Sequence, residues 1–351
     1  MLQRNFKEFF LENILDFLWR QWSTLGVLGQ ARTEDKWVID PEALLVFSLK
    51  ITRHEPRLFD EIMDWLCING IWLDIQRLRG ILREKEDKTR RLIGAVSNFL
   101  TAQGQERKWR NLAKLSLLKG IITTKESLFI EKSGKPYPVT NSPDPLFLDY
   151  GFNRSSYERS KKSREINFKT FSAIRFLLRS LFGIGSRSEC ILYLLTHEAG
   201  HPSEIAKAVG ISVRGVQDSL IELAKSNLIL TRIKGKRKIE YWLSQKKWWE
   251  FFFGMNFEEI ERKKPIWLDW ISLYSALANV WNVLNEVEKT KSDYMKSSKL
   301  REAMETISFE FSESGIDLPP IPDKNVRPEN YEEEFQNFIK GVLGAESGTN
   351  R

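Results

Sequence analysis

The sequence contains little cysteine and no long apolar run, and both absences restrict what the chain can be. Its two cysteines, Cys67 and Cys190, are too few and too far apart for a disulfide framework. Lysine and acidic residues interrupt the apolar positions near the amino terminus, which is not the pattern of a secretory signal peptide. No stretch reaches the apolar length that crosses a bilayer. We therefore expect a cytoplasmic protein without a membrane partner.

The sequence also lacks the motifs of common nucleotide-dependent and cofactor-dependent enzymes. It has no phosphate-binding P-loop, no dinucleotide fingerprint, and no Ser/His/Asp order in a supporting context. On these grounds we expect a protein that is not an enzyme and that uses no cofactor.

Charge is unevenly distributed along the 351 residues, whose formal sum is +7. Residues 154–190 hold nine Lys/Arg against three acidic residues, whereas residues 302–335 hold ten acidic residues against two bases. A basic middle followed by an acidic tail suits a polyanionic partner.

The apolar pattern predicts a mainly α-helical protein of several domains. The composition, 42% hydrophobic with 12 tryptophans, is sufficient for a substantial core. Prolines interrupt regular structure in two places, at 136–145 and at 319–328. We expect a helical domain (1–115), an irregular connector with short strands (116–165), a winged helix-turn-helix (166–253), tryptophan-rich helices (254–312), and an acidic, partly disordered tail (313–351).

Helix start and stop signals are concentrated between residues 186 and 227. Ser186 and Glu189 have the spacing of a capping box, which opens a first helix. Pro202 suits the first turn of a second, short helix, and Gly210 suits the tight turn that ends it. Ser212 can cap a third helix, 213–227. A short helix, a three-residue turn and a longer helix make a helix-turn-helix.

The third helix divides into two faces at 100° per residue. One side is apolar and should face the core: Val216, Leu220 and Leu223. The opposite side combines residue types that bind base edges in the major groove with one apolar residue: Arg214, Gln217, Asp218 and Ile221. We expect Arg214, Gln217 and Asp218 to read bases in double-stranded DNA.

A basic hairpin is predicted directly after that helix. Two β-like segments, 228–233 and 239–243, flank a glycine-containing turn. The hairpin carries five bases that can approach the phosphate backbone: Arg232, Lys234, Lys236, Arg237 and Lys238. Ser203 and Ser212, near helix starts, are further candidates for phosphate contacts.

The segment from Ile205 to Ile229, with the basic hairpin, resembles the winged-helix transcription regulators of the MarR and ArsR type. The resemblance covers about 186–253 and rests on six small or apolar residues at the expected spacings: Ala206, Gly210, Val216, Leu220, Leu223 and Leu228. It implies a sequence-specific DNA-binding regulator of transcription, often dimeric. The large flanking regions have no counterpart in those small proteins.

His197-Glu198-Ala199-Gly200-His201 competes with this interpretation, because it spells the H-E-x-x-H motif of zinc metalloproteases. That chemistry requires both histidines on one face of a continuous helix, and Pro202 disfavours helical geometry at His201. We expect His197 to lie at a helix end and to interact with the terminal carbonyls. A bound metal is not expected.

A second alternative is a protein–protein adaptor or antitoxin-like partner that uses the winged helix as an interaction module. Ile221 on the predicted reading face has two interpretations, a contact with a thymine methyl group or part of a protein interface. The tryptophan-rich stripe at 266–287 has two interpretations, a buried core helix or the interface of a homodimer.

Overall fold

The structure is a computed structural model, and it describes residues 2–29, 36–83, 85–117, 125–140, 142–235, 238–254, 256–323 and 325–346. Within these ranges the chain is mainly helical, as predicted from the apolar pattern. Lys236 and Arg237, two expected phosphate contacts, lie outside the described residues.

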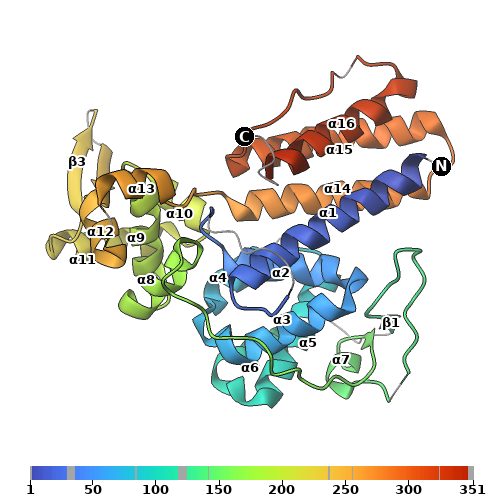
Figure 1. Cartoon of the computed structure of the whole chain (residues 1–351), viewed down its shortest axis with the longest axis horizontal. Helices are drawn as coiled ribbons and strands as arrows, with labels where there is room; N and C mark the ends of the chain where they lie inside the picture. The colour runs from blue at the N-terminus through green and yellow to red at the C-terminus, as the bar shows by residue number, and fades with distance from the viewer. Residues whose placement is uncertain are drawn as a thin grey trace.

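The first part of the chain forms a helical body with a small parallel ladder at its edge (Figure 1). Its elements are α1 (Leu2–Thr24), α2 (Pro41–Ile51), α3 (Pro56–Asn69), α4 (Ile75–Leu82), α5 (Asp87–Leu100), α6 (Glu106–Leu117), β1 (Glu126–Ser127), α7 (Pro145–Leu148) and β2 (Phe152–Asn153). Single helical turns cover Thr52–His54 and Gly70–Trp72, and a kinked turn, Thr101–Gln105, joins α5 to α6.

The middle of the chain forms a second body that carries an antiparallel hairpin. A turn at Phe171–Ala173 leads into α8 (Ile174–Phe182), α9 (Ser186–Thr196), α10 (Pro202–Val209), α11 (Val213–Lys225), β3 (Leu230–Lys234), β4 (Lys238–Trp242), α12 (Gln245–Phe253) and α13 (Phe257–Lys263). The chain then returns to the first body through α14 (Trp270–Glu288), α15 (Asp293–Ser314) and α16 (Pro328–Glu346).

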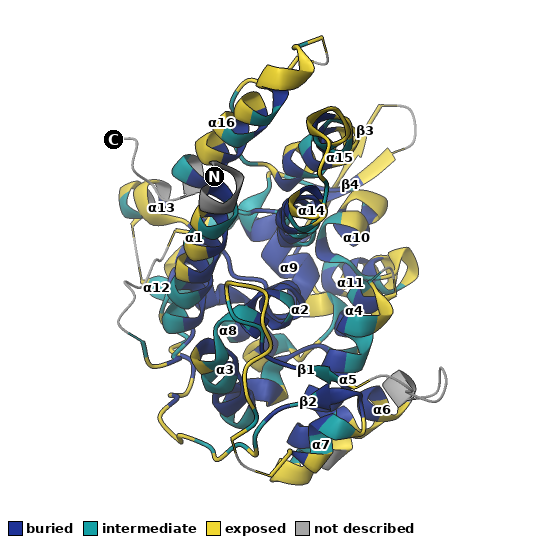
Figure 2. Ribbon diagram, turned by 90° about the vertical axis from the view of Figure 1, so that its right-hand side faces the viewer, coloured by how far each residue is buried: buried dark blue, intermediate teal, exposed yellow. Residues whose placement is uncertain are grey.

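Two apolar cores hold these elements, and they do not follow the five expected segments. The larger core combines α1–α7 with α14–α16, so the expected amino-terminal domain and the tryptophan-rich helices share one interior. The smaller core is built from α8–α13 and the hairpin. Figure 2 shows buried residues around α2 and α9, with exposed residues along the hairpin and α11.

In the expected acidic tail, 313–351, a last short helix was predicted at 331–342, and the structure has a longer one there. Its residues 328–346 form α16, whose apolar residues recur at helical spacing and are buried against α15 and the larger core: Tyr331, Phe335, Phe338, Ile339 and Val342. Prolines 319, 320 and 322 precede the helix, and Pro328 occupies its first position, where its missing N–H costs no hydrogen bond.

The expected connector, 116–165, also contributes to the larger core. Leu128, Phe147, Tyr150 and Phe152 are buried, and β1 pairs in parallel with β2. The short strands were anticipated, but this segment packs against the first body instead of simply spanning the distance between two domains.

Candidate nucleic-acid interface

The helices α9, α10 and α11 pack against one another around a short turn. Gly210 ends α10 in the left-handed region, with φ of 67°, where a side chain would be strained. Ser212 caps α11, because its hydroxyl accepts a hydrogen bond from the Gly215 amide at 3.3 Å. The predicted roles of Pro202, Gly210 and Ser212 in starting and ending these helices are confirmed.

The two faces of α11 are also as predicted. Val216, Leu220 and Leu223 are buried in the smaller core. Arg214, Gln217, Asp218 and Ile221 are exposed, and the Arg214 side chain retains 94% of its accessible surface. Its Nε lies 4.0 Å from the Asp218 carboxylate, which gives a weak ion pair within the helix. The helix thus presents an uncovered polar flank.

The hairpin β3–β4 is tied to this flank through the segment before α10. Gly200 and Tyr241 exchange two backbone hydrogen bonds of 2.9 Å, so residue 200 acts as a short third strand beside β4. A Cβ at Gly200 would lie 2.7 Å from the Tyr193 ring and 2.8 Å from Ile205, so only glycine fits. The sequence analysis did not predict this backbone pairing. A signal for it was present in the sequence, because Gly200 is a glycine between two predicted helices.

The described bases of the hairpin are all occupied by acidic partners. Arg232 contacts Glu198 at 2.8 Å and Glu240 at 3.1 Å, and Lys234 lies 3.0 Å from Glu240. Lys238 lies 2.6 Å from Glu204. We call these contacts the hairpin pairs. A DNA phosphate would have to replace an exposed carboxylate at Glu198 and Glu204 and a buried one at Glu240.

Electrostatics at the hairpin pairs favour the charged carboxylates. The hydrogen bond from Lys234, joined by that from Arg232, lowers the pKa of Glu240, although desolvation opposes this shift. Hydrogen bonds from Lys238 and from the His201 amide lower the pKa of Glu204. Glu240 and Glu204 therefore stay ionised at neutral pH.

Ser203, the remaining expected phosphate contact, lies exposed in the first turn of α10. Its hydroxyl is 2.8 Å from His201 Nδ1, and its amide donates to the same nitrogen at 3.3 Å. Its position at a helix start is as expected, but its hydroxyl already has a neighbouring partner.

The H-E-x-x-H motif does not form the helix that a zinc protease requires. The helix α9 ends at Thr196, and His201 is extended and caps α10. His197 stacks on the Tyr193 ring at 3.9 Å, and its Nδ1 lies 3.0 Å from the Tyr193 carbonyl. The predicted helix-end role of His197 is confirmed. Among the described residues, no group of three potential ligands could hold a metal ion.

The basic segment 154–190 does not form a single surface patch. Its excess of Lys/Arg over acidic residues therefore overestimated the positive charge available to a polyanionic partner. Four of its arginines are half-buried or buried in ion pairs with the first body: Arg154 with Asp60, Arg159 with Asp64, Arg175 with Asp40, and Arg179 with Glu42. These carboxylates come from residues 40–64, so a local count could not reveal the pairing. Much of the expected positive field is neutralised inside the protein.

Glu189 was expected to cap α9 with Ser186, and this is wrong. The N-cap of α9 is Gly185. The Glu189 carboxylate is buried between Arg175 and Arg179, and the distance from its Oε1 to Arg179 Nη2 is 2.7 Å. Ser186 instead contacts the Ser219 hydroxyl of α11 at 2.6 Å. Two buried guanidinium groups attract the carboxylate more strongly than exposed backbone amides do.

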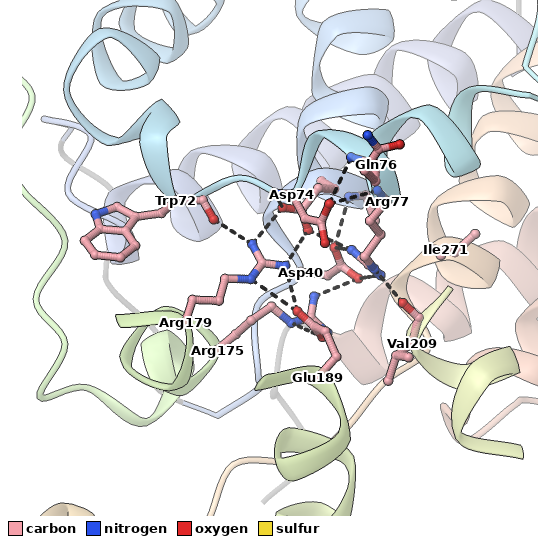
Figure 3. Close-up of polar contacts among 12 residues, drawn as sticks. Asp40, Trp72, Asp74, Gln76, Arg77, Arg175, Arg179, Glu189, Val209 and Ile271 are labelled. Atoms are coloured by element: carbon pink, nitrogen blue, oxygen red, sulfur yellow. Dashed lines mark hydrogen bonds and ion pairs between the residues drawn. The ribbon is translucent and has the colours of Figure 1, made fainter. Parts of the chain in front are cut away.

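Three arginines and three carboxylates form one buried cluster at the junction of the two bodies (Figure 3). We call it the arginine cluster: Asp40, Glu42, Arg77, Arg175, Arg179 and Glu189. Arg179 bridges Glu42 at 2.7 Å and Glu189 at 2.7 Å, and Arg77 contacts Glu42 at 2.8 Å and also Asp40. The formal charges balance, which a buried site requires.

The pKa values of the arginine cluster follow from burial opposed by charge. Burial alone would raise the pKa of Asp40, but the guanidinium groups of Arg175 and Arg77 outweigh it and lower this pKa. Burial would likewise raise the pKa of Glu42, and Arg179 with Arg77 lowers it. Asp40 and Glu42 are therefore charged partners inside the fold.

The arginine cluster also reaches the turn of the helix-turn-helix. Arg77 Nε donates to the Val209 carbonyl at 2.6 Å, at the end of α10. Arg179 donates to the Trp72 carbonyl at 2.9 Å, beside α4. The orientation of α10 and α11 on the first body is thus fixed by charged hydrogen bonds.

The tryptophan-rich stripe is core, the first of its two interpretations. Trp270 and Trp281 are 2% and 5% exposed and pack, with Tyr274, inside the larger core. The Trp270 indole donates to the Val38 carbonyl at 2.6 Å. The apolar face of α14 is covered by α1, α2 and α15, so it cannot be the expected homodimer interface.

Comparisons with protein-family models, with curated proteins and with solved structures return no match for this chain. In the part of the chain that the structure describes, every helix is too short or too polar to cross a bilayer.

Proposed function

We propose that residues 186–253 form a winged helix-turn-helix that binds double-stranded DNA, and that the protein regulates transcription through it. The observation that carries this proposal is the uncovered flank of α11, where Arg214, Gln217 and Asp218 stand exposed on a rigid, capped helix. Arginine and glutamine in this position match the hydrogen-bonding edges of guanine and adenine.

The surrounding charge supports a polyanionic partner of modest affinity. Residues 186–253 carry eleven Lys/Arg and seven Asp/Glu, and Glu189 is buried in the arginine cluster. The hairpin lies after the recognition helix, where a wing supports the duplex backbone. Because the hairpin pairs must open to release cations, we expect binding to depend strongly on salt.

A duplex library selected at two salt concentrations tests this function. Arg214→Ala should relax sequence choice at one base position, by about 1–3 kcal/mol. The triple variant Lys236→Ala/Arg237→Ala/Lys238→Ala should weaken all duplexes alike and flatten the salt dependence.

The matched control is Arg262→Ala on α13. Arg262 is exposed and lies 3.9 Å from Glu258, four residues before it, and Arg214 lies 4.0 Å from Asp218, four residues after it. This control should leave both sequence choice and affinity unchanged. Equal binding by the wild-type chain and the Arg214 variant would reject the proposed surface.

One observation favours the adaptor as a second candidate. Ile233 and Ile239 are paired across the hairpin and are 77% and 48% exposed, which is unusual for isoleucine on a free surface. If the protein is an adaptor, the wild-type chain should bind no duplex of the library even at low salt. Crosslinking from residue 239 in cells would then join the chain to one protein species, and Ile233→Ser would abolish that crosslink.

A further inference from the structure

A groove of about 520 Å³ opens on the first body, between the start of α3 and the segments around β1 and β2. Its walls come from residues 56–61, 127–139 and 153–160, and we call it the connector groove. Figure 1 shows β1 on the opposite side of the molecule from the hairpin β3–β4. Long irregular segments that are held against a core often carry binding residues.

The charged groups that line the connector groove nearly balance one another. Arg57 and Arg154 are its cations, and Asp60, Glu61 and Glu158 are its acidic residues. Arg154 is buried, lies 2.8 Å from the Asp60 carboxylate and stacks over four aromatic rings, so its charge is already used inside the fold. The remaining acidic residues outnumber Arg57 by one. Because neither sign dominates, the groove favours a neutral ligand.

Polar groups at the connector groove lack hydrogen-bond partners. Asn153 Oδ1 and Arg154 Nη1 are buried and have no partner among the described residues. Burial raises the pKa of Asp60 to about 6, although Arg154 opposes this shift, so the carboxylate is short of hydrogen-bond donors. Buried polar groups in native proteins are normally hydrogen-bonded, and a bound molecule can supply the missing partners.

The same groups require a ligand that both donates and accepts hydrogen bonds. The Asp60 carboxylate only accepts, the Arg154 guanidinium only donates, and the Asn153 amide does both. A hydroxyl group does both through one oxygen, so a ligand with several hydroxyl groups can match all three.

An aromatic ring completes the site. Tyr137 lines the connector groove and is 39% exposed, so its ring offers a flat apolar face beside the polar groups. We propose that the connector groove binds a neutral sugar, with hydroxyl groups on Asp60 and Asn153 and one face of the sugar ring against Tyr137. Sugar binding by the first body goes beyond the proposed function of α11 and does not depend on it.

Binding is tested by saturation-transfer NMR and calorimetry on the full chain with four neutral disaccharides: maltose, cellobiose, lactose and mannobiose. We expect at least one of them to bind, with one molecule per chain. Its neutral monosaccharide should displace it at least fivefold more effectively than the corresponding uronate or amino sugar. A gain in affinity from monosaccharide to disaccharide would support the end of a polysaccharide as the source, and equal affinity would support a free sugar.

Two variants test the site itself. Tyr137→Ala removes the apolar face and should weaken binding of the disaccharide at least tenfold. The matched control is Tyr294→Ala, because Tyr294 on α15 is 72% exposed and lies outside the connector groove. Asn153→Ala should weaken binding at least fivefold without lowering the urea midpoint, because it removes a buried oxygen that has no partner within the described chain.

Three results would overturn the inference. The first is the absence of binding by all four disaccharides. The second is wild-type affinity in both Tyr137→Ala and Asn153→Ala, which would place the sugar elsewhere. The third is stronger displacement by the uronate or the amino sugar than by the neutral monosaccharide. None of these measurements uses DNA, so their failure is distinct from a failure of the duplex selection.

Discussion

The arginine cluster and the hairpin pairs are built from the same residue types, but they differ in burial. Arg179 and its partners Glu42 and Glu189 are fully buried, whereas the Arg232 side chain is 43% exposed and its partner Glu198 is 86% exposed. When one residue of an exposed ion pair is removed, water solvates the charge that remains. When one residue of a buried ion pair is removed, the remaining charge is left unpaired in a medium of low dielectric constant, which destabilises the fold. Buried pairs therefore fix a structure, and exposed pairs can be exchanged for another anion.

Removing one buried arginine is the strongest test of this difference. Arg179→Met should lower the free energy of unfolding by about 3–5 kcal/mol, because Glu42 and Glu189 lose a shared partner. Urea denaturation measures the change. Arg187→Met is the exposed control, since Arg187 and Glu222 are both more than half exposed, and it should cost less than about 1 kcal/mol.

A compensating change sharpens the result. Arg179→Met/Glu189→Gln restores the balance of charge in the arginine cluster, with two arginines facing Asp40 and Glu42. The double variant should be more stable than Arg179→Met alone. If it is less stable, packing rather than charge balance explains the effect of Arg179.

Acid should affect the buried carboxylates in a direction set by their partners. The pKa values of Asp40 and Glu42 lie below the ordinary 3.8 and 4.5, so the native state binds fewer protons than the unfolded state. Their contribution is present above about pH 4.5 and is lost as the pH falls through the native values. The free energy of unfolding should therefore decrease below pH 4.5.

The same titration reverses in Arg179→Met. Glu42 loses the guanidinium group that lowers its pKa most, so burial raises this pKa. Three carboxylates then face two arginines, so protonation relieves the excess negative charge, and the deficit relative to the wild-type chain should shrink between pH 7 and pH 5. A deficit that stays constant over this range would contradict the assignment.

The smallest effect is expected at the hairpin. Arg232→Met removes a contact with the exposed Glu198 and one with the buried Glu240, and Glu240 keeps its contact with Lys234, so the urea midpoint should stay within experimental error of the wild-type value. Lys207→Met, which removes another exposed pair, is the control. A large loss of stability in Arg232→Met would show that the hairpin pairs are structural and unsuited to exchange with phosphate.

Local signals predicted where α10 and α11 begin and where α10 ends, because Pro202, Gly210 and Ser212 act through the backbone within a few residues. The faces of α11 followed from helical geometry in the same way. The arginine cluster could not be predicted like this. Arg179 contacts Glu42, which lies 137 residues away in the sequence. The sequence around an arginine does not show whether its side chain is solvated or is buried against a carboxylate.

The acidic tail shows a different limit. Four prolines between 319 and 328 suggested irregular structure, and the helix that follows was underestimated. The repeated spacing of Tyr331, Phe335 and Ile339 was the better signal, because an apolar stripe needs a surface to cover it. The connector groove had no signal in the sequence, since its walls come from residues 56–61, 127–139 and 153–160.

The larger core joins the two ends of the described chain, with α1 packed against α14 and α16 packed against α15. During synthesis, α1 leaves the ribosome long before α14 exists, so Phe10, Ile14 and Leu18 emerge without their native cover. The smaller core lies within one continuous stretch apart from Val38 and can assemble earlier. The nascent protein thus acquires the smaller core, with α10 and α11, before the larger core that orients it, and α1 is the segment that chaperones would meet in the meantime.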